Sequence, residues 1–325
     1  MSEILSLASE NILSPIILSF ILGAVAALAR SDLTFPEAAA KALSIYLLFA
    51  IGFKGGVSVA GHGPDASLGA ALLAGIVLST ILPFVAFPLL RLMTRLDRLN
   101  AAAVAGHYGS ISIVTFLAGS SLLTQRGVDA EGFMVAVAAV MEAPAILSAL
   151  WLVSRSGTSR VDAGLMREIM LNGSIVLLVG AFAIGWITGA DGMQKIEPFI
   201  GAPFQGVLCL FLLDMGLIAG RGLRRAGASL GVGAILFGIV MPLVGSLVGL
   251  GAASLLDLSL GGTVLMMILA ASASYIAVPA AMRVALPEAD PSIYLTLSLG
   301  VTFPFNLAVG IPLYYALALA AEGGF

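Results

Sequence analysis

The segment Gly109-Ser110-Ile111-Ser112 lies in the middle of a long apolar stretch, and Ala271-Ser272-Ala273-Ser274 lies in the middle of another, 162 positions further along the chain. That offset is half of the 325 residues. Polar groups at membrane depth usually serve a function, because an unsatisfied polar group is costly in hydrocarbon. Two such pairs at matching places in two halves indicate an internal repeat. Secondary transporters use such repeats to place interrupted helices around a substrate site near the bilayer midplane.

The composition is that of a polytopic, all-α membrane protein. Hydrophobic residues make up 60% of the chain, the mean hydropathy is +1.09 and only 10% of residues are charged, whereas soluble domains have about 25% charged residues. Cys209 is the only cysteine and lies in an apolar run, which predicts a packed thiol without an internal disulfide. The first residues lack the basic region of a cleavable signal peptide.

A helix needs about 20 apolar residues to cross the hydrocarbon layer, and the chain offers ten such stretches. The predicted spans cover residues 13–30, 37–58, 67–91, 100–124, 132–153, 168–188, 203–220, 228–255, 261–284 and 292–319. Pro15 and Pro36 lie near the starts of the first two, where a missing N–H is harmless.

The basic residues predict the orientation. Eleven of them fall on one side of the ten spans, namely Arg30, Arg91, Arg95, Arg98, Arg155, Arg160, Arg167, Arg221, Arg224, Arg225 and Arg283. The other side has only Arg126 and Lys195, and Lys41 and Lys54 fall within spans. By the positive-inside rule, we expect a multi-pass protein of the inner (plasma) membrane with both termini away from the cytoplasm.

Ten spans divide into two sets of five, residues 1–158 and 159–325, and an odd number forces the second set to enter the membrane in the opposite orientation. Three features recur in the same order in both sets. Spans two and seven carry similar runs, spans four and nine carry the serine pairs, and spans five and ten carry the mid-span prolines Pro144 and Pro304. We therefore predict two inverted five-helix repeats, with broken helices four and nine crossing near the midplane.

A small anion is the ligand that the serine pairs favour. Gly109 permits backbone that a helix does not tolerate, and a break there leaves a half-helix whose free N–H groups and positive dipole end attract an anion. Span nine offers the same arrangement. The predicted anion-binding residues are Gly109, Ser110, Ile111, Ser112, Ser272, Ala273 and Ser274. The alternative is that these small residues only allow close helix packing.

A cation site is the second expectation. Glu142 lies near the centre of span five, where a carboxylate is costly and by default functional; otherwise it is a protonated acid bonded to a neighbouring helix. Thr302 and Asn306 share a helix face and, with Thr115, offer the neutral oxygens that a hard cation such as Na⁺ prefers. Asp214 either joins this set or pairs with Arg221.

Catalytic motifs are absent from the sequence: there is no metalloprotease motif, glycine-rich phosphate loop, Cys/His cluster or Gly-x-Ser-x-Gly. We therefore expect a protein that is not an enzyme, has no cofactor apart from a coupling ion, and has no nucleic-acid partner.

Taken together, the motifs resemble those of the sodium-dependent bicarbonate transporter family, nearly end to end. The resemblance rests on Ser14-Pro15, Ile51-Gly52-Phe53-Lys54-Gly55-Gly56, Gly109-Ser110-Ile111-Ser112, Met141-Glu142-Ala143-Pro144-Ala145, Ala270-Ala271-Ser272-Ala273-Ser274 and Thr302 through Pro312. It implies a homotrimer, with a gate domain (spans one, two, six and seven) against a core domain (spans three to five and eight to ten). It also implies bicarbonate between the broken helices, with Na⁺ nearby, and a PII-like cytoplasmic regulator.

The chain departs from the cyanobacterial members of that family in two respects. Tyr275 follows Ser272-Ala273-Ser274, whereas those members have Ser-Ser-Ser-Asp, so the coupling ion and its stoichiometry stay open. The long cytoplasmic insertion between spans five and six is absent, so regulation by a PII-like partner stays open as well. Glu142 stands where those members have an aspartate, so a mid-membrane acid is kept.

The resulting hypothesis is a sodium-coupled importer of a small anion, bicarbonate first, that works by alternating access. One alternative has the same architecture but carries another solute, such as an organic anion, with protons moving through Glu142 or His107. A passive anion channel is a second alternative.

Overall fold

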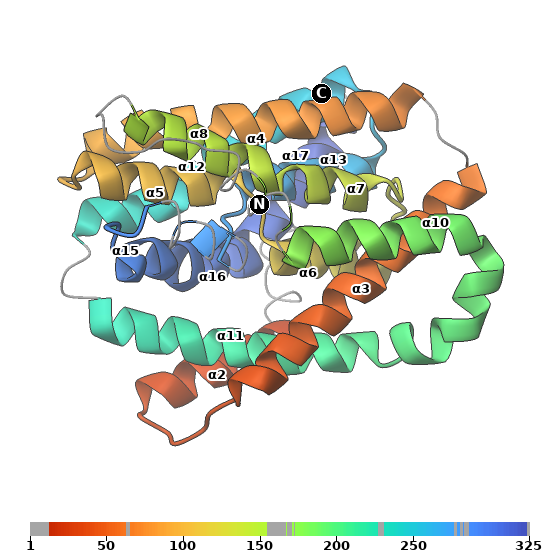
Figure 1. Cartoon of the computed structure of the whole chain (residues 1–325), viewed down its shortest axis with the longest axis horizontal. Helices are drawn as coiled ribbons and strands as arrows, with labels where there is room; N and C mark the ends of the chain where they lie inside the picture. The colour runs from red at the N-terminus through yellow and green to blue at the C-terminus, as the bar shows by residue number, and fades with distance from the viewer. Residues whose placement is uncertain are drawn as a thin grey trace.

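The computed structural model describes residues 13–62, 66–154, 167, 171, 173–226, 231–275, 278–279, 282 and 286–323, which are helical almost throughout (Figure 1). No strand occurs in that part of the chain, and the all-α prediction is confirmed. The helices are α2 (Pro15–Leu28), α3 (Glu37–His62), α4 (Ala66–Met93), α5 (Arg98–Gly109), α6 (Ile113–Gln125), α7 (Met134–Val140), α8 (Glu142–Ser154), α10 (Gly173–Ile200), α11 (Phe204–Ala226), α12 (Val232–Leu255), α13 (Leu260–Ala271), α15 (Pro291–Leu295), α16 (Phe303–Phe305) and α17 (Ile311–Glu322), with π-helical turns at Thr296–Thr302 and Asn306–Gly310.

Several helices begin where the sequence supplies a cap. The side chains of Ser14, Asp97 and Ser259 each accept a hydrogen bond from a backbone N–H in the first turn of α2, α5 and α13. Such side chains satisfy N–H groups that every helix leaves free at its start. Local sequence therefore determines where these helices begin.

The described residues contain eight helical stretches that are long and apolar enough to cross a membrane. They are Glu37–Gly61, Ala66–Met93, Arg98–Gln125, Met134–Val153, Val176–Ile200, Phe204–Arg224, Val232–Leu255 and Pro291–Glu322. The helices α2 and α13 are apolar but have only 14 and 12 residues. At about 1.5 Å per residue they are shorter than the hydrocarbon layer.

The predicted span 13–30 thus corresponds to the shorter helix α2, and the predicted broken span 261–284 begins with α13. The helix α13 ends at Ala271 because the chain becomes extended at the following serine. Part of the remainder of 261–284 lies outside the described residues.

The sixth predicted span, 168–188, ends directly before a kink in the structure. Within α10 the backbone of Gly189 is non-helical, with φ 54° and ψ −145°, angles that glycine tolerates, and a second helical segment follows up to Ile200. The residues after the kink include Asp191, Lys195 and Glu197. Their polarity lowers the hydropathy below that of a span, but it does not prevent a helix.

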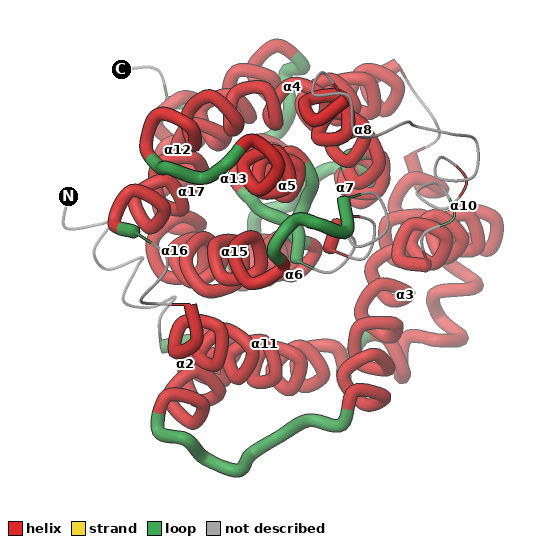
Figure 2. The backbone as a smooth tube through the Cα atoms, turned by 60° about the vertical axis from the view of Figure 1, so that its left-hand side comes forward, coloured by secondary structure: helices red, strands yellow, loops and turns green. Residues whose placement is uncertain are grey.

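The helices form two groups (Figure 2). In the first, here called the four-helix group, α3 packs against α10 and α2 packs against α11. The remaining helices form a central group, with α5 and α13 in its middle (Figure 2). The runs Ala101–Gly109 and Gly261–Ala271 of these two helices are buried throughout. A helix that is buried on all sides needs no polar face.

Close contacts at glycines hold the four-helix group together, and they recur in reciprocal pairs. A Cβ atom on each of four glycines would overlap a carbonyl oxygen of the partner helix: Gly216 that of Phe20, Gly56 that of Phe182, Gly23 that of Leu213 and Gly185 that of Phe53. Small residues allow such close approach of helix backbones in membranes. The contact of α2 with α11 is thus repeated by the contact of α10 with α3. In this repeat α2 corresponds to α10 and α11 corresponds to α3, so each contact joins the first half of the chain to the second.

Arginines gather at one end of α2 and α11. Arg221 donates a hydrogen bond to the carbonyl of Leu33 and Arg224 donates to that of Ala27, both at 2.8 Å. Arg30 lines the same hollow. These bonds satisfy carbonyl groups at and beyond a helix C-terminus. The predicted cytoplasmic residues Arg155, Arg160 and Arg283 lie outside the described part of the chain.

Candidate functional site

The first serine pair interrupts a helix. The helix α5 ends at Gly109 and α6 begins at Ile113, with Ser110 and Ser112 in extended conformation (φ −93° and −103°). A Cβ atom at Gly109 would overlap the ring of Pro83, so only glycine allows α5 to approach α4 this closely. Ser112 caps α6 by accepting a hydrogen bond from the N–H of Thr115 at 3.2 Å. The predicted break at this position is confirmed.

The second serine pair also ends a helix. The helix α13 stops at Ala271, and Ser272 is extended with φ −90° and ψ 165°. The Ser274 hydroxyl accepts a hydrogen bond from the N–H of Val278 at 3.4 Å. In both halves the hydroxyl of the second serine thus accepts a hydrogen bond from a backbone N–H three or four positions later.

The two interruptions cross in contact with each other. The N–H of Ser112 donates to the Ser272 hydroxyl at 2.9 Å, and the N–H of Ser274 donates to the carbonyl of His107 at 2.8 Å. The four serines Ser110, Ser112, Ser272 and Ser274 are at most 3% exposed. Backbone groups that each broken helix sets free are therefore satisfied partly by the other one.

Two of the serine hydroxyls are largely committed to the protein. A hydroxyl has one proton to donate and two positions at which it accepts. The Ser272 hydroxyl donates to the carbonyl of Leu269 at 3.0 Å, so its proton is used. The Ser112 hydroxyl accepts from both the N–H and the hydroxyl of Thr115, so it retains only its proton for a ligand.

The other two serine hydroxyls are freer to bind. The Ser110 hydroxyl is buried and has no hydrogen-bond partner among the described residues. The Ser274 hydroxyl accepts one bond and keeps its proton. Ser110, Ser112 and Ser274 can therefore offer O–H donors to an anion, while the buried neighbours Ile111 and Ala273 contribute backbone alone.

Thr302 and Asn306 lie beside the crossing, but both already make structural hydrogen bonds. Thr302 donates to the carbonyl of Gly238 at 2.7 Å, so Tyr108 must be the donor in its 2.6 Å bond to Thr302. Each of the two candidate ligands nevertheless keeps one free lone pair on its side-chain oxygen.

The amide of Asn306 joins the second interruption to α17. Its Nδ2 donates to the carbonyl of Ala271 at 2.9 Å, and its Oδ1 accepts from the Tyr314 hydroxyl at 2.8 Å. Asn306 begins one π-helical turn and Thr302 ends another, and such turns occur frequently at functional sites.

Glu142 lies at a third interruption, between α7 and α8. The hydroxyl of Ser79 in α4 inserts there, donating to the carbonyl of Met141 and accepting from the N–H of Ala145 at 3.1 Å. It replaces the helical bond that would join these two backbone groups. Glu142 is only 4% exposed, and its Oε2 has no hydrogen-bond partner among the described residues.

Asp214 differs in position from the other candidate cation ligands. It is buried in α11, within the four-helix group. Thr115, Glu142, Thr302 and Asn306 all belong to the central group. Thr115 has both acceptor positions of its hydroxyl free, because that hydroxyl acts as a donor to Ser112.

Several residues of the site were not identified from the sequence. Ser79, Tyr108 and Tyr314 support Met141, Thr302 and Asn306 through hydrogen bonds between distant parts of the chain. In the sequence each of them is a polar residue within an apolar stretch, and that pattern does not predict which distant residue it will bond to.

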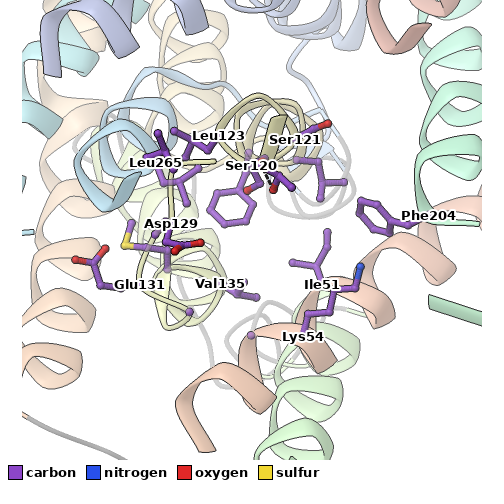
Figure 3. Close-up of a pocket in the computed structure, with 18 of the residues that line it drawn as sticks. Ile51, Lys54, Ser120, Ser121, Leu123, Asp129, Glu131, Val135, Phe204 and Leu265 are labelled. Carbon is purple, nitrogen blue, oxygen red and sulfur yellow. Dashed lines mark hydrogen bonds between the residues drawn. The ribbon is translucent and has the colours of Figure 1, made fainter. Parts of the chain in front are cut away.

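A cavity of about 430 Å³ lies between the two groups at the end of α11 that starts with Phe204 (Figure 3). Lys54 and Phe204 lie on one wall, Asp129 and Glu131 lie on the other, and Ser120 of α6 also faces it (Figure 3). The lining also includes Phe116, one helical turn beyond Ser112. The cavity therefore extends along α6 toward the crossing of the two interruptions.

The charged groups of this cavity have different environments. The Lys54 Nζ lies 4.6 Å from the centroid of the Phe204 ring, within range of a cation–π interaction. Glu131 accepts hydrogen bonds from the N–H and hydroxyl of Ser259, at 2.7 and 3.0 Å. Glu131 thus anchors the start of α13, whereas Asp129 is exposed.

Comparison with known families gives a match over nearly the whole chain. The family model of the Na⁺-dependent bicarbonate transporter superfamily covers residues 15–319, which include every helix described above apart from the last three residues of α17. No curated protein matches the chain.

Proposed function

Since the chain belongs to the Na⁺-dependent bicarbonate transporter superfamily, we propose that it is a secondary active transporter that takes up bicarbonate together with Na⁺ by alternating access. The observation that carries this proposal is the crossing of two interrupted segments inside a fully buried region. Three serine hydroxyls there keep a proton that no described group accepts. Such donors, beside half-helix N-termini, suit a small anion.

The reciprocal glycine contacts support an inverted-repeat architecture of ten helices. Phe20 and Phe182 are 162 positions apart, as are Gly23 and Gly185, and the same offset relates the serine pairs. Contacts that exchange the two halves are expected from a pseudo-two-fold axis. The four-helix group then corresponds to the gate, and the central group to the core.

Two cavities at opposite ends of α11 support alternating access. One is the cavity beside Lys54, and the other, of about 340 Å³, is lined by α11 residues such as Gly222 and by Thr296 and Gly300 of the central group. Both lie between the two groups. Relative movement of gate and core would open one cavity toward the crossing while closing the other.

In this proposal the anion binds to Gly109, Ser110, Ser112 and Ser274, with Ser272 holding the crossing together. Na⁺ is a transported ion and not a resident cofactor, and it binds oxygens of Glu142, Thr115, Thr302 and Asn306. Asp214 is the less favoured cation ligand, because it lies in the other helix group. Both ligands must stabilise the same conformation for coupling.

The proposal also covers the orientation of the protein in the membrane and its assembly. The arginines at one end of α2 and α11 favour a cytoplasmic location for that end, with both termini on the opposite side of an inner membrane. The exposed apolar faces of α2, α10 and α12 suit lipid or further copies of the chain. Family membership favours a homotrimer, whereas a PII-like regulator stays open because the cytoplasmic insertion between spans five and six is absent.

The decisive test is uptake of labelled bicarbonate into proteoliposomes with an inward Na⁺ gradient, compared with choline replacing Na⁺ at fixed pH. Concentrative uptake only with Na⁺ is the expected result. Absence of uptake by folded protein under both conditions would overturn the bicarbonate assignment. Glu142→Gln should abolish Na⁺-dependent accumulation, and a variant that keeps the wild-type Na⁺ dependence would contradict the cation assignment.

A proton-coupled carrier of another small anion is the second candidate. The observation that favours it is the buried Glu142, with one carboxyl oxygen that no described group contacts by a hydrogen bond. Such a carrier predicts accumulation that follows an imposed pH gradient and is indifferent to replacement of Na⁺ by choline.

A further inference from the structure

Tyr275 lies at the crossing, directly after Ser274. Its side chain is 8% exposed, and its ring packs edge-on against Phe303 with centroids 5.2 Å apart. The hydroxyl makes no hydrogen bond of ordinary geometry with the described residues, although it approaches the Ser112 side chain. The ring is thus fixed by packing, while the hydroxyl makes no hydrogen bond of ordinary geometry to the described residues.

Other buried tyrosines of the central group differ in this respect. The Tyr108 hydroxyl donates to Thr302 and the Tyr314 hydroxyl donates to Asn306, at 2.6 and 2.8 Å. A buried tyrosine normally finds such a partner, because an unmade hydrogen bond in the interior costs the full desolvation of the group. An exception at the proposed anion site therefore calls for a ligand as its explanation.

The neighbouring Ser112 cannot serve as the acceptor for Tyr275. Both acceptor positions of the Ser112 hydroxyl are occupied by the N–H and hydroxyl of Thr115. The Ser112 proton can still point to the Tyr275 oxygen, whereas the Tyr275 proton has no acceptor among the described residues. A buried O–H donor without an acceptor is complementary to an oxyanion and unfavourable for a cation.

We propose that the Tyr275 hydroxyl donates a hydrogen bond to the transported anion, alongside Ser110 and Ser112, and sets the affinity for it. This inference rests on the proposed function, since it concerns the same site. The ligand that fits is a small oxyanion with acceptor oxygens on more than one side. The contact of the ring with Phe303 holds the hydroxyl in position before the anion arrives.

The test is Tyr275→Phe, which removes the hydroxyl and keeps the ring. Uptake of bicarbonate is measured in proteoliposomes against bicarbonate concentration at saturating Na⁺, and melting temperature is measured without bicarbonate. The expected result is a KM about tenfold higher or more, the effect of losing a hydrogen bond to a charged ligand. Maximal rate and melting temperature should stay near the wild-type values.

Tyr46→Phe is the matched control, because it removes one hydroxyl from the four-helix group, where Tyr46 donates to the carbonyl of Phe199. Its KM should equal that of the wild type. An unchanged KM in Tyr275→Phe would overturn the inference while leaving the proposed function intact. A Tyr275→Phe protein that melts markedly earlier or fails to fold would also overturn it, because the hydroxyl would then be structural. Absence of uptake by the wild type would instead refute the proposed function.

Discussion

The four-helix group and the crossing in the central group keep the internal repeat to different degrees. In the four-helix group, the approach of Gly216 to Phe20 is matched by that of Gly56 to Phe182. At the crossing, the bond from the N–H of Ser112 to the Ser272 hydroxyl has no such counterpart. A symmetric bond would join the N–H of Ser274 to the Ser110 hydroxyl, but Ser274 donates to His107 instead.

This difference separates scaffold from site. Packing of one helix backbone against another depends on shape alone, so the same glycine contact can stabilise both halves of the repeat. A site that binds one anion next to one cation needs different groups on its two sides, so its two halves cannot be identical. The departure from symmetry leaves the Ser110 hydroxyl without a hydrogen bond to the described residues and commits that of Ser272, so one of two related serines becomes available to a ligand.

The largest expected effect breaks the symmetric contacts. Gly56→Leu places a side chain where even a Cβ would overlap the Phe182 carbonyl, so the unfolding free energy should fall by about 3 kcal/mol or more. Gly216→Leu should have a similar effect, because the contact is reciprocal. The measurement is thermal unfolding of the detergent-solubilised protein. Gly180→Ala, whose Cβ would meet nothing within 4 Å, is the control, and equal melting of all three would contradict the contact.

Ser79→Ala sharpens the comparison within the central group. It leaves the carbonyl of Met141 and the N–H of Ala145 without the bonds that Ser79 supplies. A loss of about 2 kcal/mol in stability is expected, together with a weaker Na⁺ dependence of uptake because Glu142 adjoins this break. Ser254→Ala is the control, since its hydroxyl bonds only within its own exposed helix surface. A Ser79→Ala protein as stable as this control would refute the inserted bond.

Ser110→Ala and Ser272→Ala compare the two halves of the crossing directly. Ser272→Ala should lower stability by about 1–3 kcal/mol, because the buried N–H of Ser112 loses its acceptor. Ser110→Ala should leave stability within about 0.5 kcal/mol of wild type, since no described bond is lost, while raising the KM for bicarbonate about tenfold. Unfolding and uptake are measured on both variants. Equal changes in stability and in KM for Ser110→Ala and Ser272→Ala would mean that the two halves of the crossing are functionally equivalent.

Lys54→Gln is expected to have the smallest effect. Lys54 lines the cavity but lies outside the crossing, so its charge acts on the approach of an anion. The KM should rise about two- to threefold at low ionic strength and return to the wild-type value near 1 M salt, where charges are screened within about 3 Å. A change in KM that persists at high salt would indicate direct contact with the anion.

The sequence predicted the helical class, the approximate span positions and the break at Ser110–Ser112, because hydropathy and small polar residues act locally. It did not predict the helical segment of α10 after Gly189. The charged residues of that segment lower its hydropathy, and hydropathy identifies only helices that are surrounded by lipid or by apolar side chains. The anion and cation assignments at the serine pairs and at Glu142 remain predictions.

The bonding of individual side chains was beyond the sequence for a different reason. The bridge formed by Ser79 depends on two backbone groups 62 and 66 positions away, and a polar residue in an apolar stretch does not specify which helix it will meet. The same holds for Tyr275: its significance comes from the acceptor positions that Thr115 fills on Ser112, which only the folded arrangement determines.

The exchange of partners between halves also has a consequence for synthesis. The helix α2 packs on α11, so the backbone groove at Gly23 stays uncovered until the ribosome has made about 200 further residues, which takes about 10–40 s at common elongation rates. The glycine face of α2 is therefore exposed to lipid, or to other nascent chains, throughout that interval, and the face of α3 at Gly56 is exposed until Phe182 of α10 has been made. Assembly of this protein in the membrane has to wait for its second half, and a chain that stops after α8 would leave both faces open.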